Sequence, residues 1–164
     1  MKGCGARTAI VFAERNQVPR FGSGLVDLEV LKTTNSAFCD FLHDKYTTLK
    51  DAPERIFATT VEAKWSYIKP LLGEIDFNAI FETVRKTILE TFATHVSLGV
   101  QQTIFAMGEN VLAKVPAIDK ISFTMPNQHR ILANLAPFNM ENKNEIFVAT
   151  SEPFGLIKGT IARD

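Results

Sequence analysis

Residues 76–92 read DFNAIFETVRKTILETF, and this stretch decides the fold class. Its apolar side chains recur at the spacing of one helical face: Phe77, Ile80, Phe81, Val84, Ile88 and Phe92. Asp76 precedes the first of them, at the position where a carboxylate can cap a helix N-terminus. We therefore predict an amphipathic helix that begins after Asp76 and packs one face on a core.

A second helix is predicted directly after it, with Ser97 as a possible cap and Pro116 as its end. Its apolar stripe consists of Ile104, Phe105, Gly108, Val111, Leu112 and Val115. One turn before this stripe stands Gln101. The free N–H groups and the dipole of a helix N-terminus favour electron-rich ligand atoms, so the Gln101 amide is a candidate binding group.

Strand-like runs lie on both sides of the helix pair. Two come first, separated from each other by a predicted turn at 22–24; the second, 25–34, alternates with Val26, Leu28 and Val30 on one face. The third run, 55–67, places Arg55 on the same face as its apolar residues. Two further runs, 118–135 and 145–161, follow the helices. This order predicts an α+β fold, an antiparallel sheet with two helices packed on one face.

Composition narrows the functional classes. The chain has 164 residues, 46% of them apolar, which suits one globular domain. Its formal net charge is zero, which argues against nucleic acid or an anionic membrane as the partner. Neither the three histidines nor the two cysteines, Cys4 and Cys39, show metal-ligand spacing, so we expect no metal site and reduced thiols in a cytoplasmic protein.

The segment 125–129, MPNQH, introduces polar groups beside an apolar strand. In an extended chain Asn127 and His129 point to the same side as Met125, where a core is expected. An amide and an imidazole in that position need partners, because unpaired buried polar groups are unfavourable. Either they satisfy one another and the backbone, or they line a site for a polar, planar ligand.

Six segments of the chain resemble the second half of urate oxidase (uricase), in consistent order and spacing from about Thr8 to the C-terminus. They are VLKTTNSAF (30–38), DKYTTL (44–49), RIFAT (55–59), VQQTI (100–104), MPNQH (125–129) and PFGLIKGT (153–160). The resemblance implies that residues 1–164 form a single T-fold (tunnelling-fold) domain, like the C-terminal domain of uricase. It further implies oxidation of urate by O2 to 5-hydroxyisourate and H2O2, without metal or organic cofactor, in a multi-subunit barrel.

The same resemblance implies a role for four substrate-binding residues. Phe38 matches the ring that stacks on the purine, and Arg55 matches the guanidinium that binds one edge of urate. Gln101 matches the amide on the opposite edge, and Val100 matches the backbone N–H beside it. From the residues alone, Phe38 could equally be core, Arg55 could pair with a nearby carboxylate, and Gln101 could be an ordinary first-turn residue.

Two further residues match catalytic positions of the family. Asn127 matches the residue near O2 or peroxide above the ring, and His129 matches the histidine of the proton relay. Uricases also carry a first, N-terminal domain, whose Lys–Thr pair assists proton transfer and whose Thr–Asp pair binds the purine across an interface. No residue of this chain matches those pairs, so the site requires an N-terminal-half chain as partner.

Two alternatives stay open at this point. A purine-binding T-fold remnant without catalysis would keep Phe38, Arg55 and Gln101 but lack a base that activates urate. A T-fold enzyme acting on pterins would need a zinc-binding His or Cys cluster, which the sequence does not show.

Overall fold

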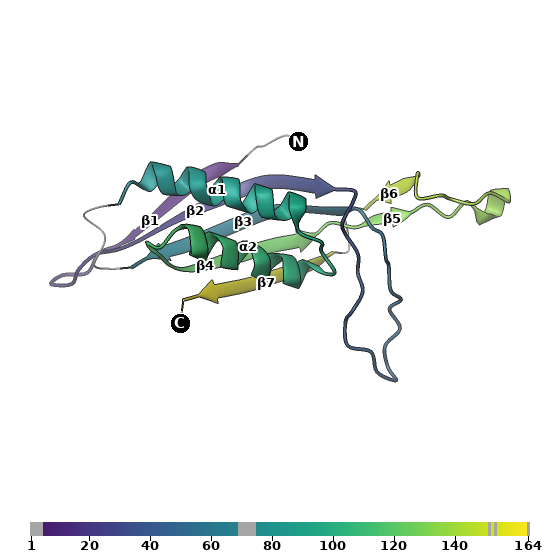
Figure 1. The fold of residues 1–164 in the computed structure, drawn as a ribbon, viewed down its shortest axis with the longest axis horizontal. Coiled ribbons are helices and arrows are strands. Elements are labelled where there is room, and N and C mark those ends of the chain that lie inside the picture. Colours follow the sequence, from purple (N-terminus) through teal and green to yellow (C-terminus); the bar gives the residue numbers. More distant parts are fainter. Residues whose placement is uncertain (1–4, 69–74, 151, 153, 164) are drawn as a thin grey trace.

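A computed structural model describes residues 5–68, 75–150, 152 and 154–163, and has the predicted α+β architecture (Figure 1). The elements in chain order are β1 (Ala6–Phe12), β2 (Arg20–Lys32), β3 (Phe57–Tyr67), α1 (Phe77–Thr94), α2 (Val100–Lys114), β4 (Ile118–Asn127), β5 (Arg130–Leu132), the 3-10 helix η2 (Ala136–Phe138), β6 (Phe147–Ala149) and β7 (Gly155–Ala162). The main sheet is antiparallel in the order β1-β2-β3-β4-β7, and β5 pairs with β6 in a separate hairpin. Both long helices cover one face of the main sheet.

The core forms between α1 and the helix-facing side of the sheet. The residues of α1 that the spacing placed inward, Phe81, Val84, Ile88 and Phe92, are buried, and Phe57 of β3 meets Phe92 with ring centroids 5.0 Å apart. Asp76 is the N-cap as predicted: its Oδ1 accepts hydrogen bonds from the backbone N–H groups of Asn78 and Ala79. Side-chain periodicity and capping therefore determine this helix locally.

The start of α2 and one flank of its stripe differ from the prediction. Gly99, not Ser97, is the N-cap, because the Ser97 hydroxyl instead accepts a hydrogen bond from Thr103 Oγ1 at 2.7 Å. Phe105 is 59% exposed, whereas Met107 is fully buried. Phe105 and Met107 lie on opposite sides of the apolar stripe, at similar angles from its centre. Only the side that carries Met107 is covered by the rest of the fold.

The predicted turn at 22–24 is wrong, because these residues belong to β2. Gly22 pairs with Ile10 and Gly24 pairs with Thr8, and both glycines pair with β3 on their other side. A Cβ on Gly24 would lie 2.5 Å from Thr8 Oγ1 and 2.9 Å from the carbonyl oxygen of Ala63. The glycines thus permit close approach of side chains from the neighbouring strands, and the chain reverses instead between β1 and β2.

A β-bulge in β2 changes which side chains face the core. The register shifts between Leu25 and Leu28, and Asp27 has a positive φ of 57°. As a result Leu25, rather than the predicted Val26, is buried with Leu28 and Val30. Strict alternation could not predict this, since a bulge inserts one residue into the two-residue period.

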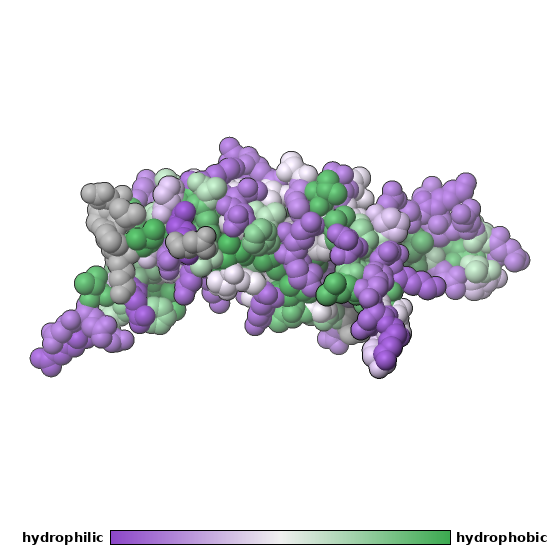
Figure 2. Space-filling model, turned by 60° about the horizontal axis from the view of Figure 1, so that its bottom comes forward, coloured by the Kyte–Doolittle hydropathy of each residue, from purple (hydrophilic) through white to green (hydrophobic). Residues whose placement is uncertain are grey.

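The last strand approaches α2 closely through two glycines. A Cβ on Gly159 of β7 would lie 2.9 Å from Ile104, and one on Gly108 of α2 would lie 2.6 Å from the Ile161 side chain. The space-filling view shows apolar side chains along the body of the molecule, while the projecting ends are hydrophilic (Figure 2). In the described ranges, no helix has the length and apolar character that crossing a bilayer would require. The expected breaks at 69–73 and at Pro153 lie outside the described residues.

Candidate functional site

The long β2–β3 connection folds back on the link between the helices. Ala37 N–H donates to the Ser97 carbonyl at 2.7 Å, and Cys39 N–H donates to the Leu98 carbonyl at 3.2 Å. These backbone hydrogen bonds hold Phe38 against the segment that leads into α2. Two stretches that are about sixty residues apart in sequence are thereby joined beside the N-terminus of α2.

Arg55 is anchored to the same connection, just before β3 begins at Phe57, and not within the strand as predicted. Its backbone N–H donates to the Ser36 carbonyl at 3.0 Å, and its Nε donates to the Ala37 carbonyl at 2.8 Å. The guanidinium carbon lies 5.0 Å from the centre of the Phe57 ring. Nη2 is buried and has no hydrogen-bond partner, and burial lowers the pKa of the group.

Asn127 meets Arg55 at the end of β4. Its Oδ1 accepts a hydrogen bond from Arg55 Nη1 at 3.3 Å. The next residue fixes this position, because Gln128 N–H donates to the Ala58 carbonyl at 3.1 Å and its Nε2 donates to Thr60 Oγ1 at 3.2 Å. The amide oxygen of Asn127 is thus satisfied by a charged partner from the connection before β3.

His129 lies two residues further on, half-buried. Its carbonyl oxygen accepts hydrogen bonds from the N–H and the hydroxyl of Thr150, both at 3.3 Å. These contacts bring the backbone of His129 next to the end of β6. Arg130 Nη1 donates to the same oxygen at 3.0 Å, so backbone and side-chain donors together hold the main chain of His129.

The N-terminus of α2 supplies the remaining predicted groups. Val100 is the first helical residue and is buried, whereas Gln101 is exposed at the second position. The N–H groups of a first helical turn have no partner within the helix. The Gln102 side-chain oxygen accepts a hydrogen bond from Leu98 N–H, which lies outside the helix, at 2.9 Å. This oxygen therefore does not occupy the free N–H groups of the first turn.

Phe38 belongs to an aromatic stack that sequence reasoning missed. Its ring stacks on Phe41 with centroids 4.6 Å apart, and Phe41 stacks on His43 at 4.2 Å. Phe38 itself is half-buried. The Phe-x-x-Phe-x-His spacing, read as a compact loop, could have indicated the stack.

Two further groups behind Arg55 were also missed. Lys32, the last residue of β2, is 8% exposed, and its Nζ donates to the His95 carbonyl at 2.7 Å. Burial and then the positive charge of Arg55 lower the pKa of Lys32, while burial and then Lys32 lower the pKa of His95. The sequence could have indicated this, because Lys32 stands two residues after Val30 and therefore points to the same, core-facing side of the strand.

Unpaired buried polar atoms concentrate in this region. Of the described residues, the side-chain atoms without a hydrogen-bond partner are Ser36 Oγ, Arg55 Nη2, Thr59 Oγ1 and His95 Nε2. Each belongs to the end of β2, the start of β3 or the end of α1, or to the connections that adjoin them. Since buried polar groups are rarely left unpaired, these atoms make this region the candidate site for a polar ligand.

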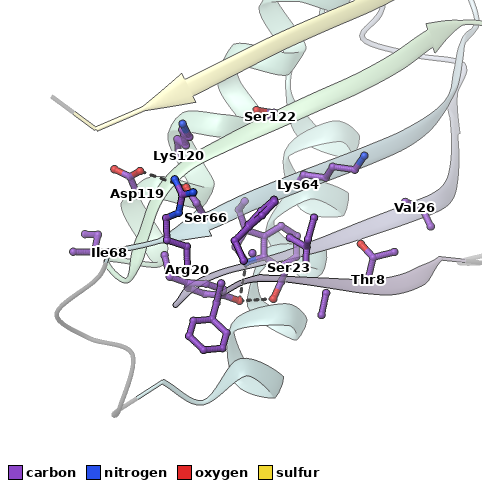
Figure 3. Close-up of a pocket in the computed structure, with 17 residues that line it drawn as sticks. Thr8, Arg20, Ser23, Val26, Lys64, Ser66, Ile68, Asp119, Lys120 and Ser122 are labelled. Carbon is purple, nitrogen blue, oxygen red and sulfur yellow. Dashed lines mark hydrogen bonds between the residues drawn. The ribbon is translucent and has the colours of Figure 1, made fainter. Parts of the chain in front are cut away.

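A separate cavity of about 910 Å³ lies at the other end of β3 (Figure 3). It is lined by Lys64 and Ser66 of β3, by Arg20 of β2, and by Asp119 and Lys120 of β4. None of the predicted site residues lines it. Within the ranges that the structure describes, no group of three or more His, Cys, Asp or Glu side chains is placed to hold a metal ion.

Comparisons with known proteins identify the family of the chain. The family model described as Uricase matches residues 21–158. The chain is 44% identical to the uricase of Arthrobacter globiformis over 142 residues, which are 87% of this chain and 46% of that protein. It is 37% identical to the uricase of Dictyostelium discoideum over 153 residues, covering 93% of this chain and 52% of the relative.

The solved structures give the same result. The crystal structure of uricase from Arthrobacter globiformis matches with a TM-score of 0.91 and 40% identity, over 99% of this chain and 55% of that one. The chain thus spans about half the length of the relatives it matches. Its two helices on an antiparallel sheet are the T-fold of those structures. On sequence and on structure, the chain belongs to the uricase family.

Proposed function

We propose that this chain is one half of a cofactor-independent urate oxidase, which converts urate, O2 and water to 5-hydroxyisourate and H2O2. Residues 1–164 would form a single T-fold domain equivalent to the second half of a uricase. The observation that carries the proposal is the unpaired, buried Nη2 of Arg55, next to Asn127 and to the loop that bears Phe38. A cytoplasmic location stays a prediction.

The binding groups suit a flat, anionic purine. Arg55 supplies positive charge and a free donor, and its Nε and Nη1 are already anchored, which leaves Nη2 for the ligand. Gln101 and the Val100 N–H at the start of α2 supply a donor and an acceptor for the opposite edge. Phe38 supplies an aromatic face for stacking.

The catalytic groups are Asn127 and His129 at the end of β4. Asn127 would hold O2 or peroxide near the ring, and His129 would move protons, since imidazole exchanges protons near neutral pH. Urate must lose a proton to become electron-rich enough to react with O2. The remaining proton-transfer groups would come from the N-terminal-half chain.

Two features support a multi-chain assembly. The described sheet ends at β1 and β7, and an unpaired strand edge is a template for pairing with another chain. Strand β1 also exposes Ile10, Val11 and Phe12, each more than half accessible. Continuation of the sheet across these edges would build the barrel and bring the N-terminal-half chain to the site.

The test is to follow urate loss and O2 uptake for the chain alone and after mixing with the first half of the Arthrobacter globiformis uricase. Activity in the mixture only is the expected result. Activity of the chain alone would show that the N-terminal-half chain is dispensable. The Arg55→Ala variant should be inactive in the mixture, whereas Arg20→Ala, at the separate cavity, should retain the parent's activity.

A second candidate is a purine-binding remnant without catalysis. It is favoured by the fact that Phe38, Arg55 and Gln101 all lie on this chain, while the chain covers about half of its relatives' length. Urate binding without O2 uptake, both alone and in the mixture, would decide for this candidate.

A further inference from the structure

Lys32 is a buried lysine with two contacts that favour the ammonium form, although burial and the charge of Arg55 lower its pKa. Its Nζ donates to the carbonyl of His95, the C-cap of α1, at the negative end of the helix dipole. The same Nζ lies 5.3 Å from the centre of the Phe92 ring, within range of a cation–π interaction. Both contacts stabilise the protonated side chain inside the fold.

Arg55 is the second cation of this region, and it is close enough for its charge to act on Lys32. In the part of the chain that the structure describes, the ion pairs are formed by other residues, and neither Lys32 nor Arg55 pairs with a carboxylate. The buried Lys32 and the half-buried Arg55, without a counter-charge, repel one another and are poorly solvated. An anion bound at Arg55 would relieve both effects.

Three hydrogen bonds and the short stretches of backbone between them connect the two cations. Lys32 holds the His95 carbonyl, and two residues later the Ser97 carbonyl accepts from Ala37 N–H. The carbonyl of Ala37 in turn accepts from Arg55 Nε. Lys32 therefore holds the α1–α2 connection, against which the Phe38 loop is paired and from which Val100 and Gln101 continue.

We propose that Lys32 is a second buried charge that makes the Arg55 site select anions, and that it positions the α1–α2 connection without contacting the ligand. This inference rests on the proposed function and deepens it: the negative charge of urate becomes a determinant of binding in addition to its shape and hydrogen-bonding edge. Lys32 is thus a positioning and specificity-determining residue, not a catalytic one.

The test compares two ligands and three substitutions. Urate is an anion at neutral pH, whereas hypoxanthine is an uncharged purine of similar outline. Lys32→Met and Lys32→Gln remove the charge and keep much of the side-chain length, and Lys32→Arg keeps the charge. Lys64→Met, at an exposed lysine near the separate cavity, is the matched control. Dissociation constants are measured calorimetrically on the chain mixed with the first-half uricase chain, and thermal melts identify variants that fold.

The neutral variants should bind urate about tenfold more weakly, the order expected for losing one nearby charge in a partly buried site. Their affinity for hypoxanthine should change less than about twofold, since that ligand carries no charge. Lys32→Arg should restore urate binding, and Lys64→Met should not alter it.

Equal weakening of both ligands would overturn the proposal, because a purely structural role would affect them alike. Unchanged urate affinity in a folded neutral variant would overturn it as well. A parent mixture that binds no urate overturns both this inference and the proposed function, whereas a parent that binds urate normally isolates the failure to Lys32.

Discussion

The guanidinium of Arg55 and the amide of Asn127 are joined by a hydrogen bond of 3.3 Å, although they stand 72 residues apart in the sequence. One belongs to the loop before β3 and the other to the end of β4. The pair connects the group proposed to bind the purine with the group proposed to face O2. The proposed binding group and the proposed catalytic group are therefore in direct contact. Substitution of Arg55 should mainly weaken urate binding, whereas substitution of Asn127 should mainly slow turnover.

Arg55→Ala should raise the dissociation constant for urate by at least about 100-fold, the effect of losing a charged, multiply hydrogen-bonded donor of roughly 3 kcal/mol. Calorimetric titration of the mixture with the first-half chain measures it. The control is Arg20→Ala, which removes an exposed guanidinium from the far end of the sheet. Retained affinity in Arg55→Ala would remove Arg55 from the site.

Asn127→Ala should leave urate affinity within about threefold of the parent, because Arg55 keeps its anchor to the Ala37 carbonyl through Nε. Turnover per bound urate should fall by about tenfold or more if the amide orients O2. O2-electrode rates at saturating urate measure this, with Gln17→Ala in the β1–β2 turn as the control. Weaker binding with unchanged turnover would contradict the oxygen-side role.

Asp76→Ala should destabilise the fold by about 1 kcal/mol, since the side chain caps α1 through two backbone N–H groups. Urea denaturation measures the loss, and urate binding by the folded fraction should stay unchanged. The control Glu82→Ala, at an exposed position of the same helix, should change stability by less than about 0.5 kcal/mol. Equal stability of the two variants would show that the cap contributes nothing.

Gly108→Ala should destabilise by about 1–3 kcal/mol, because its new Cβ would lie 2.6 Å from the Ile161 side chain of β7. The same substitution should be milder in an Ile161→Ala background, where most of the opposing atoms are gone. A double-mutant cycle of unfolding free energies measures this coupling. Strict additivity would mean that the two side chains do not meet.

His95 should make stability depend on pH. Burial, and then the charge of Lys32, lower the pKa of His95 below its ordinary value of 6.5, so the unfolded chain binds more protons just below that value. The contribution of His95 to the free energy of unfolding is therefore fully present above about pH 6.5 and is lost as the pH falls below that value. Melting temperatures between about pH 7.5 and 5.5 should fall more steeply for the parent than for His95→Gln.

The matched control for this profile is His43→Gln, which removes an exposed imidazole from the tip region of the β2–β3 connection. In the His43→Gln background, His95→Gln should still flatten the profile. Parallel curves for the parent and His95→Gln would show that His95 does not titrate differently in the folded chain.

Local chemistry in the sequence determined the two long helices, the α+β class and the family. The face from Phe81 to Phe92 and the Asp76 cap are properties of neighbouring residues, and the structure confirms both. The α+β class also follows from chain order, because adjacent strands and a helix pair have few ways to bury their apolar faces together. The segments 30–38, 55–59 and 125–129 indicated the uricase family, which the comparisons confirm.

Tertiary contacts decided what local patterns could not. The local pattern predicts a turn at the glycines 22 and 24. In the structure these glycines instead allow the neighbouring strands to approach closely, which depends on residues that are distant in the sequence. Ser97 lost the capping role to Gly99 because Thr103 bonds its hydroxyl.

The junction of Arg55, Asn127 and the Phe38 loop, with Lys32 behind it, arises from segments that meet only after folding. Periodicity reports which face of an element is buried, since that depends on residues a few positions apart. It does not predict which residue from a distant segment contacts a given side chain, because that contact depends on the sheet register and on how the loops pair.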